Sequence, residues 1–152
     1  MRRLASEHEE QAALMRWAWL TESARPELRL LFAIPNGGHR HRAVAVRMKA
    51  EGVRPGVPDL CLPVARGGWH GLFIELKTRR GRPSRRQRGW ITALRSNGYR
   101  VEICLGWERA RAVIESYLDG PQVGAAGSRN HPPHPHQEGE CSCRTSSKCS
   151  AA

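Results

Sequence analysis

The sequence predicts an α/β domain in which helices flank a mixed central β-sheet. Helix signals and short apolar runs alternate along residues 1–119, in the order helix, strand, helix, strand, strand, helix, strand, helix. Capping-box patterns at Ser6 and Ser84 mark the starts of two helices. The pair Gly67-Gly68 lies between two apolar runs and predicts a hairpin. A chain of 152 residues is long enough to bury one core of this kind.

The first predicted helix carries polar residues on its apolar stripe. Glu7 and Gln11 lie at helical spacing with Leu14 and Ala18, so the face that packs inward also holds a carboxylate and an amide. Buried polar groups need partners. Glu7 therefore either joins a site or complements the helix dipole from the first turn. Glu10 is an alternative for the helix carboxylate.

The next two elements follow in order. Residues 28–34 form an apolar run long enough for a buried strand, ended by the turn residues 35–38. Residues 39–51 predict a helix that stops at Gly52. Arg40 and Arg42 belong to this helix, where they could contact phosphates and could equally form part of a solvated face.

Residues 59–64 and 72–77 predict the two strands of the hairpin. Glu75 and Lys77 are two positions apart on the second strand, so they point to the same face. Asp59 opens the first strand and can lie beside Glu75. A lone Glu-x-Lys is more often a solvated pair that protects a sheet edge. Two carboxylates on adjoining strands with a cation beside them instead predict an anionic oxygen site.

Such a site suits a hard divalent cation. Mg²⁺ binds one or two carboxylates, carbonyl oxygens and several waters. The candidate ligands are Asp59, Glu75 and the carbonyl group of Leu76, and Mn²⁺ is an alternative ion. The metal would lower the pKa of a bound water and neutralise charge on a phosphate, while Lys77 would orient or stabilise the attacking hydroxide.

A run of arginines follows this strand, at the end where a phosphate would lie. The candidate DNA contacts in it are Arg79, Arg80, Arg82, Arg85 and Arg86.

Residues 84–97 predict a helix that ends at Gly98. Gln87 completes its capping box, which is a sufficient structural reason for this residue. Trp90, Ala93 and Leu94 are expected to form its core stripe, which leaves Trp90 no stacking role.

Two further elements complete the domain. Residues 99–105 alternate as a strand with Val101, Ile103 and Leu105 on one face. Residues 108–118 predict the last helix.

Composition bounds the rest of the chain. Residues 120–152 hold almost no large apolar side chains, so we expect a disordered tail; its His and Cys residues lack the spacing of a structural zinc site. The formal net charge of +11 favours a polyanionic partner. Cys61 and Cys104 lie in apolar strand patterns and predict small buried side chains in a reducing compartment. No signal peptide or membrane span is apparent, and we expect a cytoplasmic protein.

The motifs at residues 34–38, 56–59 and 74–77, followed by Gln87, closely resemble those of the VRR-NUC family within the PD-(D/E)xK nuclease superfamily. The resemblance runs from about residue 6 to residue 118. It implies a restriction-endonuclease-like fold and Mg²⁺-dependent hydrolysis of DNA. By the same resemblance, Glu7 joins the metal site, Gln87 faces it, and Gln11 and Asn36 support it.

Stand-alone members of this family look like phage or prophage enzymes that act as homodimers on branched DNA. The resemblance therefore implies a Holliday-junction resolvase type of activity in a bacterial cytoplasm. Two alternatives stay open: a non-catalytic DNA-binding module, and a general or flap nuclease without junction preference. A restriction-type nuclease is disfavoured because the chain has no room for a target-recognition domain.

Overall fold

The computed structural model describes residues 5–35, 42–78 and 81–122 and contains the predicted mixed sheet. Its strands are β1 (Phe32–Ala33), β2 (Leu60–Leu62), β3 (Leu72–Lys77) and β4 (Arg100–Leu105), in that spatial order. β2 pairs antiparallel with β1 and β3, whereas β3 and β4 are parallel. The hairpin of β2 and β3 and the α/β class are therefore confirmed.

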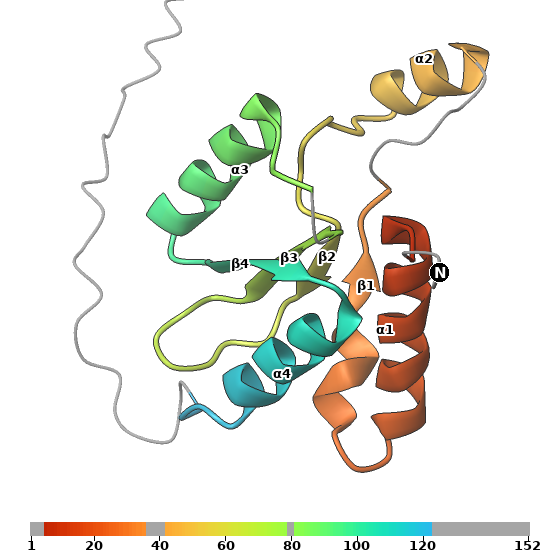
Figure 1. Ribbon diagram of the computed structural model, residues 1–152. Helices are drawn as coiled ribbons and strands as arrows, with labels where there is room; N and C mark the ends of the chain where they lie inside the picture. Colours follow the sequence, from red (N-terminus) through yellow and green to blue (C-terminus); the bar gives the residue numbers. More distant parts are fainter. Residues whose placement is uncertain (1–4, 36–41, 79–80, 123–152) are drawn as a thin grey trace, which may run out of the picture.

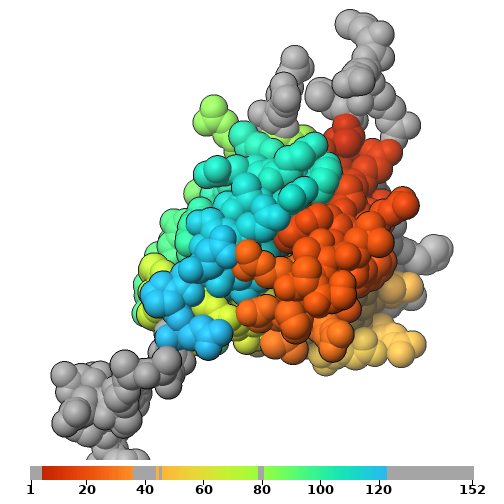
Figure 2. Space-filling view, turned by 90° about the horizontal axis from the view of Figure 1, so that it is seen from below, coloured from red at the N-terminus to blue at the C-terminus, as the bar shows by residue number. Residues whose placement is uncertain are grey.

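Helices cover both faces of this sheet (Figure 1). On one face, α1 (Glu7–Thr21) and α4 (Trp107–Leu118) pack against each other and against β3. On the other face, α3 (Arg85–Ser96) packs against β4. In Figure 2, α1 and the following residues (red to orange) lie beside the blue end of α4.

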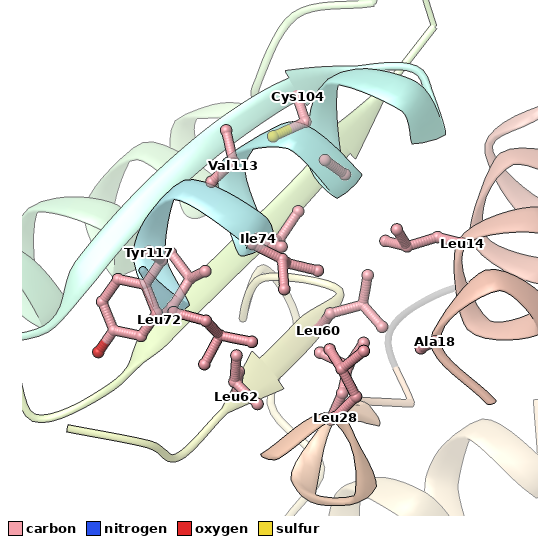
Figure 3. Packing of buried hydrophobic residues seen from close by; sticks show 14 of the residues in the cluster. Leu14, Ala18, Leu28, Leu60, Leu62, Leu72, Ile74, Cys104, Val113 and Tyr117 are labelled. Atoms are coloured by element: carbon pink, nitrogen blue, oxygen red, sulfur yellow. The ribbon is translucent and has the colours of Figure 1, made fainter. Parts of the chain in front are cut away.

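The hydrophobic core lies between the sheet and the pair of helices α1 and α4. Leu14 and Ala18 of α1 point toward Leu60 of β2 and Ile74 of β3 (Figure 3). Ala110, Val113, Ile114 and Leu118 of α4 are buried, as the helical spacing predicted. The alternate side chains of β3 point to the opposite face, and this leaves Glu75 and Lys77 outside the apolar core.

Both predicted capping boxes are present. The Ser6 hydroxyl accepts a hydrogen bond from the Glu9 N–H, and the Glu9 carboxylate accepts one from the Ser6 N–H. Ser84 and Gln87 make the same reciprocal pair at the start of α3. These caps fix where α1 and α3 begin, and so they set the positions of Glu7 and Gln87.

The predicted strand at residues 28–34 is wrong for most of its length. Residues Pro26–Leu30 form a 3-10 helix, η1, and only two residues of β1 follow it. Leu28 and Leu31 are buried, whereas Leu30 and Phe32 are exposed. This spacing of three matches the three residues per turn of a 3-10 helix. Pro26 in the first turn supplies the fixed φ that starts it.

The inward face of α3 also differs from the prediction. Ile91 is its buried apolar residue, Leu94 and Trp90 are half-buried, and Ala93 is exposed. Gln87, Ile91 and Leu94 therefore form the stripe that faces the sheet. Similarly, Val101 of β4 is buried but Ile103 and Leu105, on the same face, are exposed.

Helix α2 (Arg42–Ala50) projects from the body of the domain (Figure 1). Residues 39–41 of the predicted helix lie outside the described residues, as do Asn36 and Arg40. The predicted tail lies beyond Gln122 and is likewise outside them.

The sequence predicted some, but not all, of the buried groups with reactive or charged side chains. Cys61 and Cys104 are buried free thiols, and burial raises the pKa of each to about 11. Arg66 is also buried, at 8 % exposed, although no sequence pattern predicts it. Its guanidinium donates hydrogen bonds to the Leu118 carbonyl at 3.3 Å and to Glu27 at 2.7 Å, so it joins three segments of the chain. Among the described residues, no helix is long and apolar enough to cross a membrane.

Candidate active site

Asp59 lies directly before β2, which begins one residue later than predicted. Its backbone carbonyl accepts a hydrogen bond from the Ile34 N–H at 2.8 Å. Its Oδ2 accepts one from the Leu76 N–H, also at 2.8 Å, so the side chain is fastened to β3. Burial raises the pKa of Asp59, and the Leu76 hydrogen bond and the charge of Lys77 oppose that rise. The structure thus brings Asp59 to the strand that carries Glu75 and Lys77.

Glu75 and Lys77 form a buried ion pair on the face of β3 opposite the apolar core. Glu75 is 0 % exposed and Lys77 is 5 % exposed, and Lys77 Nζ lies 2.6 Å from Glu75 Oε1. Lys77 Nζ also donates to the Leu76 carbonyl at 2.8 Å. Burial acts to lower the pKa of Lys77, but the hydrogen bond and charge of Glu75 outweigh it and the pKa is raised. Lys77 is therefore a firmly protonated cation.

The two oxygens of Glu75 differ in their contacts. Oε2 is buried and makes no hydrogen bond to any part of the chain that the structure describes. Burial raises the pKa of this carboxyl to about 7, and the nearby charge of Asp59 adds to that rise against the contribution of Lys77. A buried carboxylate oxygen without a donor is costly. It is also the group that a cation would satisfy.

The structure distinguishes the two carboxylates proposed for α1. Glu7 Oε1 lies 3.3 Å from Lys77 Nζ, so Glu7 joins the cluster. Glu10 Oε2 instead accepts a hydrogen bond from the Trp107 N–H at 2.8 Å, in the first turn of α4. Gly106 precedes it with φ +86°, and its N–H donates to the Lys77 carbonyl at 3.1 Å. Glu10 therefore fastens α1 to the end of the strand that carries Lys77.

Gln87 reaches the same cluster from α3. Its Nε2 donates a short hydrogen bond to Glu75 Oε1, while its Oε1 accepts from the Ser84 N–H. The cap and the site contact are thus made by the two ends of one amide. Gln11, one turn after Glu7, is half-buried, and within the described ranges it makes no hydrogen bond to this cluster.

Gly56 opens the motif at residues 56–59, and the structure gives the physical reason for a glycine there. Its φ is +90°, and a Cβ atom at this position would lie 2.8 Å from the Arg86 Cβ. The loop before Asp59 therefore packs directly on the first turn of α3, and only glycine fits there. The sequence could have suggested this from a glycine three residues before a candidate ligand.

Exposed cations surround this end of the sheet. Arg82, Arg85 and Arg86 are exposed around the start of α3, where the helix dipole is positive and the first turn of the helix contains no acidic residue. Their position favours binding of anions. Arg79 and Arg80 lie outside the described residues, and of Arg42 only the backbone is described.

The donor set fits a divalent cation that keeps water ligands. No group of three or more His, Cys, Asp or Glu side chains in the described residues could hold a metal by itself. Asp59, the partnerless Glu75 oxygen and the Leu76 carbonyl are two carboxylates and a carbonyl, the combination that Mg²⁺ accepts together with water.

Comparisons with known proteins find two similar domains. The family model of the VRR-NUC domain matches residues 1–108. A solved structure titled "VRR_NUC domain protein" is similar with a TM-score of 0.68 and 28 % sequence identity, over 80 % of this chain and 94 % of that one. No curated protein matches the chain.

Proposed function

Since the chain belongs to the VRR-NUC domain family, whose members are nuclease-type domains, we propose that it is a metal-dependent endonuclease that hydrolyses DNA phosphodiesters. The observation that carries the proposal is the buried Glu75 oxygen that has no hydrogen-bond partner within the described part of the chain, beside Asp59 and Lys77. An unsatisfied buried carboxylate oxygen costs stability, and a purely structural salt bridge gains nothing from that cost.

Mg²⁺ or Mn²⁺ would be held by Asp59, Glu75 and the Leu76 carbonyl, with Glu7 as an auxiliary carboxylate. The bound ion would supply a water of lowered pKa and positive charge for the phosphate oxygens. Glu7 contributes from the side of Lys77, 3.3 Å from its ammonium.

Lys77 would orient the attacking water and stabilise negative charge as the oxygen–phosphorus bond forms and the opposite phosphorus–oxygen bond breaks. Its protonated state supports this role, because a cation that stays charged can donate hydrogen bonds throughout the reaction. Gln87 would keep Glu75 in place through its amide hydrogen bond, and Gln11 and Asn36 would support the site.

The substrate would approach over the start of α3. Arg82, Arg85 and Arg86 are exposed there and would contact phosphates, together with Arg79, Arg80, Arg40 and Arg42. Such contacts release counterions, so binding should weaken steeply as salt rises.

We also propose that the active species is a homodimer that prefers branched DNA, as a Holliday-junction resolvase does. Each copy has one cluster of Asp59, Glu75 and Lys77. A two-fold dimer presents two such clusters symmetrically about a junction, whereas a monomer would have to dissociate and rebind to make paired cuts. The competing proposals are a general or flap nuclease and a DNA-binding module without activity.

Cleavage of labelled four-way junction, flap and linear duplex tests these proposals, with Mg²⁺, Mn²⁺ or EDTA. We expect metal-dependent cutting that Glu75→Gln, Asp59→Asn and Lys77→Ala each reduce at least about 100-fold, in the range seen when a group that stabilises developing charge is removed. Glu115→Gln, a surface carboxylate paired with Arg111, is the matched control. Undiminished cutting by Glu75→Gln would place the active site elsewhere.

A thermal-shift titration gives a readout that does not depend on activity. Mg²⁺ should raise the Tm of the wild type and of Glu115→Gln but not of Glu75→Gln. Light scattering on the same samples gives the oligomeric state. A monomer that cuts linear duplex as fast as junctions would leave only the general nuclease.

A further inference from the structure

An open hollow of about 370 Å³ lies beside the candidate active site and has no part in the chemistry above. Its lining residues are Pro55, Arg86, Gly89, Trp90 and Ala93. The four that belong to α3 follow the helical spacing of three, four and seven, so they form one face of this helix. We call this feature the Trp90 hollow.

Both walls of the Trp90 hollow continue into segments that contribute to the candidate active site. Trp90 follows Gln87 by three residues, which is about 4.5 Å along a helix, and Gln87 binds Glu75. On the other wall, Pro55 precedes Gly56, which packs against the Arg86 backbone, and Asp59 follows three residues later. A ligand in the hollow would therefore lie next to the groups proposed to cut DNA.

The lining combines an aromatic ring with one cation. Trp90 is half-buried, Pro55 and Ala93 add apolar surface, and the exposed Arg86 lies at the same wall. A second hollow of about 240 Å³ shares Pro55 and adds Lys49 and Arg54. A flat apolar surface edged by positive charge is complementary to a nucleobase and its phosphate, and bases stack on aromatic side chains in sites of this type.

Gly89 provides an independent observation. It lies in the interior of α3, where glycine is less favourable than alanine by about 1 kcal/mol. A Cβ atom at this position would meet nothing within 4 Å, so packing within the described residues gives no reason for glycine. The absent side chain instead leaves the floor of the Trp90 hollow open to a ligand.

We propose that the Trp90 hollow binds one unpaired nucleotide of the DNA substrate, with its base stacked on Trp90 and its phosphate near Arg86. This inference rests on the proposed function and deepens it, because it names the feature of branched DNA that the protein would recognise. Unpaired nucleotides occur at flaps, forks and opened branch points, and intact duplex lacks them.

The test is binding of the full chain, in EDTA to prevent cutting, to labelled forks of equal length. One fork carries normal unpaired nucleotides, another carries base-free sugars at the same positions, and a linear duplex is the third probe. The variants are Trp90→Ala, Trp90→Phe and Gly89→Ala, with Trp19→Ala as the control because Trp19 is 65 % exposed on α1.

We expect Trp90→Ala to weaken binding of the normal fork about tenfold, a typical effect of losing one stacked base, and Trp90→Phe to retain most of the affinity. Gly89→Ala should raise Tm by about 2–4 °C and yet weaken fork binding severalfold. On the base-free fork and on duplex, all variants should match the wild type within about twofold. A residue that only supports the fold could not lower affinity while raising stability.

Equal binding of the normal and base-free forks by the wild type would overturn the inference, as would unchanged fork binding by Gly89→Ala. If Trp90→Ala fails to fold, Gly89→Ala and Trp90→Phe still decide it. Metal-dependent cleavage measured in parallel separates the two levels: cleavage without base-dependent binding removes only this inference, whereas loss of all DNA binding removes the proposed function as well.

Discussion

At the scale of single residues, Glu75 is the most deeply buried charged side chain among the described residues. Its carboxyl is fully buried, and burial raises its pKa to about 7 from an ordinary value of 4.5. The Glu75 carboxyl therefore binds a proton more tightly in the folded protein than in the unfolded chain. The linked stability is present below pH 4.5 and is lost as pH rises through 7. The site is thus kept at the expense of stability near neutral pH.

A comparison of the wild type with Glu75→Gln tests this at each pH, without metal. The variant cannot titrate at this position, so the Tm of the variant minus that of the wild type should grow by several degrees between pH 5 and pH 8. Differential scanning calorimetry measures it, and Glu115→Gln serves as the control. A difference that stays constant with pH would show that Glu75 is not protonated in this range.

Glu7 and Glu10 offer a second comparison between similar residues with separate partners. Glu7→Gln removes the charge beside Lys77 at an exposed position, so it should lower the cleavage rate with little change in Tm. Glu10→Gln weakens the bond to the Trp107 N–H and should lower stability by about 1 kcal/mol, a common value for a helix cap, while cleavage falls less. The reverse outcome would exchange their roles.

At the scale of elements, the sequence predicts most reliably what local chemistry decides. The Ser6 and Ser84 capping boxes and the β2–β3 hairpin depend on residues a few positions apart, and each is present. The strand predicted at residues 28–34 was wrong because nearly every residue there is apolar. Such a run does not distinguish the two-residue period of a strand from the three-residue period of a 3-10 helix, which became visible only when Leu28 and Leu31 proved to be the buried residues. The predicted inward face of α3 was wrong because Trp90 borders the loop at Pro55, which lies far away in the sequence.

The residues of the candidate site likewise fall into those that local chemistry predicts and those that it does not. Asp59, Glu75 and Lys77 could be predicted because strand geometry and pairing bring them together. The contacts of Glu10 with Trp107 and of Gly56 with Arg86 join distant segments, and no local pattern encodes them.

Two glycines with almost equal φ test the contact between the Asp59 loop and α3. Gly52 and Gly56 have φ +91° and +90°, but only a Cβ on Gly56 would clash with Arg86, whereas one on Gly52 would meet nothing within 4 Å. Both alanine variants should lose about 1 kcal/mol from backbone strain. Gly56→Ala should lose more and should also reduce cleavage, since Asp59 is displaced. Denaturant unfolding and cleavage rates together measure this, and equal behaviour of the two variants would contradict it.

At the scale of the whole molecule, two residues just past the predicted boundary at residue 119 contact the turn between β2 and β3. The Gly67 N–H donates to the Pro121 carbonyl at 2.9 Å, and Gln122 forms a β-bridge with Arg66. These contacts close the chain against the turn between β2 and β3.

Two truncations test where the domain ends. A chain ending after Gln122 should keep the Tm and the cleavage rate of the full chain, because residues 123–152 contain few apolar side chains. A chain ending after Asp119 should unfold at a lower temperature, since it lacks the contacts of Pro121 and Gln122. Loss of stability in the chain that ends after Gln122 would show that the tail contributes to the fold.

The order of the site along the chain has a consequence during synthesis. Glu7 meets Lys77, and Glu10 meets the N–H of Trp107, so the contacts that hold the carboxylates of the first helix at the site are made with residues synthesised much later. A ribosome that has released the segment up to β3 has supplied every proposed ligand, yet β4 and α4 are still missing from that chain. The nascent protein should therefore be inert toward nucleic acid cleavage until its last elements emerge, and a premature stop before Trp107 should yield a harmless fragment instead of an unregulated nuclease.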